Sequence, residues 1–274
     1  MKVLTASLGC WLLLLWFSAA GAEEVKVNML GLSRDSTVMI VSRGSNSKGT
    51  GFLIGDEHVM TCFHVVAELS AQSTSINWNV YPDLQVVLPS GEVIDGTVIS
   101  VPTQADATPL TQDFAIIKLK TKPTKSFPTV QMASEKEHLK VGDDLVFSGY
   151  PLATPGMVTH RGMVSGFDKS GSLIFLQAAI NKGNSGGALL NDQGHVVGIV
   201  SMREGGISQG LGELQVYIDK TSKEGSVQIM GVDPLQATKA IIQTLDQYIS
   251  TGIGYARSIK FARDYLSKHP ELMK

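Results

Sequence analysis

The chain has 274 residues, of which 43% are hydrophobic and 18% are charged, with 23 lysines and arginines against 25 aspartates and glutamates. This is the composition of a globular protein rather than a coiled coil. The near-zero net charge excludes the basic surface that nucleic-acid binding requires, and two cysteines are too few for a disulfide framework or a multi-cysteine zinc site.

Residues 1–22 have the three parts of a signal peptide. Lys2 supplies the positive start, residues 10–17 form a short apolar core, and Ala20 and Ala22 are the small residues before a cleavage point. An uncleaved anchor is the alternative, but the apolar core is short for a bilayer span. We expect an exported protein with no stable membrane insertion after cleavage. The single thiol left, Cys62, favours the periplasm, and otherwise secretion.

Residues 37–200 consist of short β-rich runs broken by turn residues, which predicts an all-β sandwich or barrel. Parallel α/β architecture is disfavoured because no long stretch of 3.6-residue periodicity precedes Leu235. The glycine-rich segment 205–212 is predicted to be a flexible loop. From Pro234 the pattern predicts a helix that Gly252 can stop, and a second helix is expected over 258–268.

Three segments carry the side chains that acyl transfer needs. His64 closes a β-like run, Asp113 opens an apolar strand, and Ser185 lies in a glycine-rich loop. A serine hydroxyl becomes a nucleophile when an imidazole takes its proton, and a carboxylate holds that imidazole in the correct tautomer. The order His, Asp, Ser is that of the chymotrypsin arrangement. Asp106 is the rival carboxylate, but it opens no strand.

The loop around Ser185 also predicts an oxyanion hole. Gly183 has no Cβ, so its N–H and that of Ser185 can point at one spot where negative charge develops. Residues Gly183, Asn184 and Ser185 are the candidates for this hole. The remaining histidines, at 58, 138, 160, 195 and 269, show no metal-ligand spacing, so neither a metal nor a cofactor is expected.

The chain resembles the trypsin-like serine proteases of the HtrA type. The resemblance rests on the segments 49–52, 113–118, 139–143, 149–151, 164–166 and 178–187, together with the His64 segment. It implies two antiparallel six-stranded β-barrels, the first over 23–125 with His64 and Asp113, and the second over 126–274 with Ser185. Residues 203–251 would be a helical insertion before the last strand and a C-terminal helix. Because the sequence ends at residue 274, we expect no PDZ domain and no regulation by one.

The resemblance also implies where substrate binds. Ala179 would floor the main specificity pocket, with Ile180 and Asn181 beside it and the strand residues Ser201, Met202 and Arg203 along the cleft. Because Ala179 offers no counter-charge, we expect small or medium aliphatic side chains rather than basic ones before the cleaved bond. The predicted function is a serine endopeptidase acting on peptides or proteins. A catalytically quiescent peptide-binding or chaperone-like module, motivated by the insertion, and an esterase are the alternatives.

Overall fold

The structure is a computed structural model that describes residues 28–45, 47–72, 75–100, 112–152, 154–203, 209–223, 225, 227–248 and 252–274. The proposed signal peptide, 1–22, lies outside the described residues. Among the residues that are described, no helix is both long and apolar enough to cross a bilayer.

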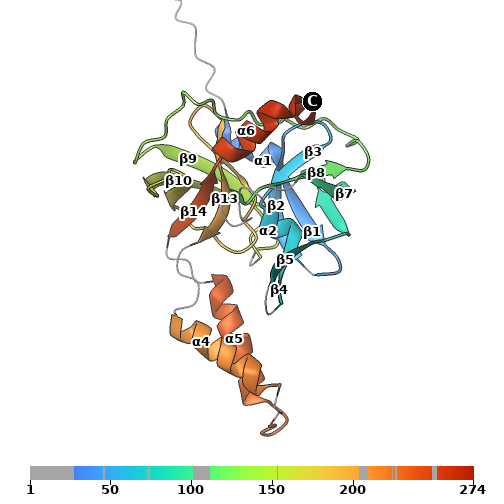
Figure 1. Ribbon diagram of the computed structural model, residues 1–274, viewed down its shortest axis with the longest axis vertical. Coiled ribbons are helices and arrows are strands. Elements are labelled where there is room, and N and C mark those ends of the chain that lie inside the picture. Colours follow the sequence, from blue (N-terminus) through green and yellow to red (C-terminus); the bar gives the residue numbers. More distant parts are fainter. Residues whose placement is uncertain are drawn as a thin grey trace, which may run out of the picture.

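The first barrel closes in the order β1-β2-β3-β8-β7-β6. Its antiparallel strands are β1 (Thr37–Ser42), β2 (Ser47–Leu53), β3 (His58–Thr61), β6 (Leu84–Val87), β7 (Val93–Ser100) and β8 (Ala115–Leu119). Burial alternates along β6 and through much of β7, so every second side chain enters the barrel. The hairpin β4 (Ala67–Gln72) and β5 (Ser75–Val80) extends from this barrel (Figure 1).

The second barrel closes in the order β10-β11-β14-β13-β12-β9. Its strands are β9 (Asp144–Gly149), β10 (Val158–Phe167), β11 (Leu173–Gln177), β12 (Ala188–Leu190), β13 (Val196–Arg203) and β14 (Ile253–Ser258). The predicted pair of antiparallel six-stranded barrels is therefore confirmed. Strand β14 closes the barrel between β11 and β13, although some fifty residues separate it from β13 in the sequence.

Helices cover the barrels and form one projection. Helix α1 (Met29–Ser36) contacts β9, and α6 (Lys260–Lys268) with the short η1 (Pro270–Met273) follows β14. The expected helix over 258–268 is confirmed in α6, with Ala262 and Leu266 buried. Between β13 and β14, helices α4 (Gln209–Thr221) and α5 (Pro234–Tyr248) form an arm that points away from both barrels (Figure 1). Helix α4 corrects the loop expected over 205–212, because it already begins at Gln209.

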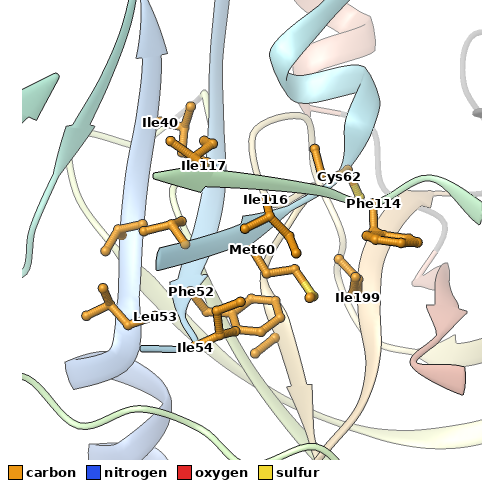
Figure 2. Packing of buried hydrophobic residues seen from close by; sticks show 14 of the residues in the cluster. Ile40, Phe52, Leu53, Ile54, Met60, Cys62, Phe114, Ile116, Ile117 and Ile199 are labelled. Atoms are coloured by element: carbon orange, nitrogen blue, oxygen red, sulfur yellow. The ribbon is translucent and has the colours of Figure 1, made fainter. Parts of the chain in front are cut away.

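Each barrel has its own apolar core. The core of the first barrel includes Phe52, Met60 and Ile116 and extends to Cys62 and Phe114, next to the predicted catalytic residues (Figure 2). The second core includes Phe147, Leu176 and Val200. Both cores are rigid supports for the loops between them, since well-packed interiors deform little.

Candidate active site

His64 and Asp113 meet because two paired strands end at the same place. Strand β3 leads into helix α2 (Phe63–Val66), which carries His64, while Asp113 lies just before β8. The two strands are antiparallel, with Thr61 opposite Ala115, so the end of one adjoins the start of the other. The His64 Nδ1 atom lies 3.0 and 2.9 Å from the two carboxylate oxygens of Asp113. This places the imidazole on the carboxylate, as the sequence predicts.

The Asp113 carboxylate is buried and surrounded by donors. It accepts hydrogen bonds from the backbone N–H of His64 at 3.2 Å and from the Ser201 hydroxyl at 2.7 Å, besides its contact with the imidazole. Burial raises the pKa of Asp113, but these hydrogen bonds and the His64 charge outweigh it and hold the pKa below its usual value. The residue has a φ of 27°, in the left-handed region that non-glycine residues seldom adopt. Asp113 is therefore an ionised acceptor fixed in an unusual backbone conformation.

Ser185 lies in the loop between β11 and β12, and this loop is tied to the first barrel through Thr50. The Thr50 hydroxyl donates to the Gly183 carbonyl at 2.6 Å and accepts from the Tyr150 N–H at 2.9 Å. The Thr50 N–H donates to the Ser185 carbonyl at 2.9 Å. Thr50 is fully buried, so these bonds are shielded from water.

The Ser185 hydroxyl donates its hydrogen bond to the backbone carbonyl of Ser201, at 2.7 Å. A hydroxyl has one proton, so in this rotamer it does not donate to the imidazole at the same time. Ser201 consequently contacts two members of the predicted triad, through its carbonyl to Ser185 and through its hydroxyl to Asp113. The sequence predicts Ser201 only as a cleft residue.

The oxyanion-hole loop is a tight turn from Asn181 to Asn184. The Asn184 N–H donates to the Asn181 carbonyl at 3.0 Å, and Gly183 has a φ of 96°. The Lys182 carbonyl accepts from the Leu152 N–H at 2.8 Å. In a trans peptide the carbonyl and the N–H point in opposite directions, so the Gly183 N–H points away from Leu152.

Two backbone donors of this loop are available to a ligand. Within the described part of the chain, the N–H groups of Gly183 and Ser185 donate to no protein acceptor. Asn184 does not fit the predicted hole, because its N–H is used in the turn. Its fully buried side chain has no hydrogen-bond partner for either polar atom among the described residues. Gly183 and Ser185 thus remain the predicted oxyanion donors, whereas the N–H of Asn184 is already bonded within the turn.

The predicted substrate-binding residues fall into different environments. Ala179 is exposed and Asn181 half-buried. Ile180 is only 1% exposed and belongs to the core of the second barrel. It packs against Gly254, since a Cβ added to Gly254 would lie 2.2 Å from the Cδ1 atom of Ile180. Ile180 therefore packs inside the second barrel and does not face an open cleft.

The backbone of Met202 and Arg203 continues β13, opposite Tyr255 and Gly254. Their side chains lie outside what the structure describes. The structure thus places Met202 and Arg203 on the strand beside the loop, and their contact with substrate stays a prediction.

Cys62 lies close to His64 and Asp113. Its buried thiol donates to the Val200 carbonyl at 3.3 Å, and burial, followed by the nearby Asp113 charge, raises the pKa of the thiol well above its usual value. Potential ligand atoms of Cys62, His64 and Asp113 lie within 4.8 Å of one another, a donor set that could hold a metal ion. Here the imidazole and carboxylate instead bond each other, and the thiol keeps its proton.

Comparison with known proteins gives a consistent result. A family model described as a trypsin-like peptidase domain matches residues 49–199. A putative protease Do-like 14 of Arabidopsis thaliana is 32% identical over 216 residues, which cover 75% of this chain and 46% of that protein. A probable periplasmic serine endoprotease DegP-like of Brucella suis is 30% identical over 215 residues, which cover 73% of this chain and 38% of the relative. The chain therefore spans less than half the length of these relatives.

Solved structures show the same fold. The serine endoprotease from Yersinia pestis matches with a TM-score of 0.56 and 18% identity, over 89% of this chain and 65% of that one. The Rv3671c protease in its inactive form matches with a TM-score of 0.53 and 20% identity, over 88% and 91% of the two chains. Since the family match alone takes in more than half of the residues, the chain belongs to the trypsin-like peptidase family, with relatives named as Do-like, DegP-like and HtrA serine proteases.

Proposed function

We propose that this protein is an exported serine endopeptidase that cleaves peptide bonds through Ser185, His64 and Asp113. The observation that carries the proposal is the carboxylate–imidazole pair, which Ser201 links to the Ser185 loop, where the N–H groups of Gly183 and Ser185 are left for a ligand. Membership of the trypsin-like peptidase family supports the same chemistry. The DegP-like relatives named as periplasmic support export.

The proposed reaction begins with attack of the Ser185 oxygen on the substrate carbonyl carbon. His64 takes the hydroxyl proton at Nε2, while Asp113, ionised because its pKa is lowered, holds Nδ1–H and stabilises the imidazolium. The carbonyl oxygen becomes negative and accepts from Gly183 and Ser185 N–H. The same proton then moves from Nε2 to the leaving amine, which leaves an acyl-enzyme. Water, deprotonated by His64, hydrolyses this ester and restores Ser185.

Attack requires the Ser185 side chain to leave the Ser201 carbonyl. Rotation about the Cα–Cβ bond would release the hydroxyl from this carbonyl. The bond to Ser201 therefore describes a resting rotamer of the nucleophile. It is also the one observation that favours the second candidate, a quiescent peptide-binding module in which this rotamer persists.

A fluorophosphonate probe combined with casein hydrolysis tests the proposal. Wild type should be labelled at Ser185 and should hydrolyse casein, and Ser185→Ala should lose both. Ser126→Ala, at an exposed serine, is the matched control and should retain both. Casein binding without labelling or turnover in wild type would instead favour the quiescent module, and hydrolysis of small esters alone would favour an esterase.

A further inference from the structure

The arm formed by α4 and α5 has one polar face. Lys239 donates to Asp219 at 2.6 Å, and Gln236 donates to Ser222 at 3.0 Å. The first contact joins α4 to α5, and the second joins α5 to the residue just after α4, so together they fix which residues lie at the same height along the antiparallel pair. Ile218 and Ile242 are fully buried, whereas most neighbouring apolar side chains of the arm are exposed.

The opposite face of the arm is apolar. At 100° per residue, Leu214 and Tyr217 turn to the side of α4 that lies away from Asp219, and Ile241 and Leu245 turn to the side of α5 that lies away from Lys239. Because the helices are antiparallel, these two sides form one surface, which we call the arm face. Leu214 is 37% exposed and Leu245 42%, while Tyr217 and Ile241 are each 60% exposed.

The composition of the arm face restricts its partner. None of its four residues is charged, and the ion pair of Lys239 with Asp219 lies on the other side of the arm. A charged partner would therefore find no counter-charge there. A membrane surface is disfavoured because interfacial helices place several cations around their apolar face, whereas among the described residues of α4 and α5 helical spacing brings one cation, Lys220, beside Tyr217. An extended peptide is disfavoured because helices offer no unpaired backbone groups to pair with it.

We propose that the arm face binds the arm face of a second copy of this chain, forming a four-helix bundle around a two-fold axis. Residues 214 and 217 repeat at i, i+3 and residues 241 and 245 at i, i+4, the spacing with which helices of such bundles fill a shared core. The arm is half of a bundle. A neutral, apolar surface with matching residues on both helices is complementary to itself, which a two-fold interface requires. Tyr217 would be the central anchor, since buried tyrosines carry much of the binding energy of interfaces.

The projection of the arm leaves this surface free. Helices α4 and α5 point away from both barrels (Figure 1), so two copies can pair through the arms without contact between their catalytic loops. The dimer does not depend on the proposed peptidase reaction, and its test requires no activity.

Sedimentation equilibrium of the purified protein tests the dimer. Wild type should have twice the mass of the chain at micromolar concentration. The double variant Tyr217→Glu with Ile241→Glu should raise the dissociation constant at least about 100-fold, because pairing would bury four carboxylates without partners. The control Val141→Glu replaces another exposed apolar residue, 64% exposed and outside the arm, and should stay dimeric.

Two results would overturn the proposal: a wild type of single-chain mass at tens of micromolar, or a double variant as dimeric as wild type. A monomeric wild type whose double variant loses cleavage of unfolded proteins, but not of short peptides, would assign the arm face to substrate instead. Thermal unfolding of the double variant should match wild type within a few degrees after correction for dimer dissociation. The second pair, Leu214→Glu with Leu245→Glu, should reproduce the loss of dimer if either variant folds poorly.

Discussion

Substitution of Gly183 by alanine tests the oxyanion hole from the backbone. The residue has a φ of 96°, and an added Cβ would lie 2.3 Å from the Tyr150 carbonyl oxygen and 2.9 Å from the Leu152 nitrogen. Both neighbours are backbone atoms, so they cannot turn aside as a flexible side chain would. The loop must shift, and the peptide between Lys182 and Gly183, held by the bond from Leu152, is the part that has to move.

The cost of this change has two components of different origin. The left-handed conformation costs alanine about 1–2 kcal/mol of folding free energy. Movement of the peptide removes one of two oxyanion donors, and loss of such a donor lowers kcat by about 10²–10³, or about 3–4 kcal/mol of transition-state stabilisation. Activity should therefore fall much further than stability.

The matched control is Gly142→Ala. Gly142 also has a φ of 96°, but nothing lies within 4 Å of its added Cβ. The Gly142→Ala variant should lose the same conformational contribution to stability in thermal unfolding and keep nearly full kcat/KM on a peptide substrate. If Gly183→Ala retains more than a tenth of wild-type kcat, or if Gly142→Ala loses as much, the assignment of the hole is refuted.

Substitutions at three further positions test other contacts. Ser201→Ala removes a hydrogen bond to the ionised Asp113 carboxylate, worth about 1.5–3 kcal/mol, and so raises the pKa of Asp113. The kcat/KM of the variant should fall at least about tenfold. On the acid side of the pH profile, the variant should lose activity at a higher pH than wild type. Thr50→Val should lower kcat at least about tenfold while Thr50→Ser should not, since only valine lacks the hydroxyl that holds Gly183. Burial raises the pKa of Glu137, but hydrogen bonds from a backbone N–H, an imidazole and an amide lower it from 4.5 to about 2. Its contribution to stability should be complete above pH 4.5 and be lost as the pH falls to about 2, so urea unfolding should show a gap between wild type and Glu137→Gln that closes over this range.

Local pattern predicted those parts of the structure that depend on neighbouring residues. Short apolar runs separated by turn residues indicated strands. The terminal helix α6 followed from its apolar spacing. His64 and Asp113 were predicted as partners from their types and order, and their contact follows from the pairing of β3 with β8. The glycines around Ser185 indicated a loop shaped for close approach rather than packing.

The sequence could not predict the contacts that tertiary packing decides. Asn184 and Ile180 sit in the predicted loop, but the turn uses the N–H of the first and the core takes the side chain of the second. Glycines at 210 and 212 weaken a helical pattern, yet α4 forms against α5. Thr50 gave no signal of its role, because its partners lie about 100 and 133 residues away.

The contacts of Thr50 and Cys62 show why catalysis would depend on how the two barrels pack. From the first barrel, Thr50 holds the carbonyls on either side of Asn184, and the Cys62 thiol bonds the carbonyl of Val200, next to Ser201. The loop of the proposed nucleophile and the strand beside it are thus positioned by the barrel that carries the imidazole. A shift of one barrel by a fraction of a hydrogen-bond length would strain all these contacts together. Alignment of Ser185 with His64 would therefore be a property of the interface between the barrels, and neither barrel alone could form the proposed site.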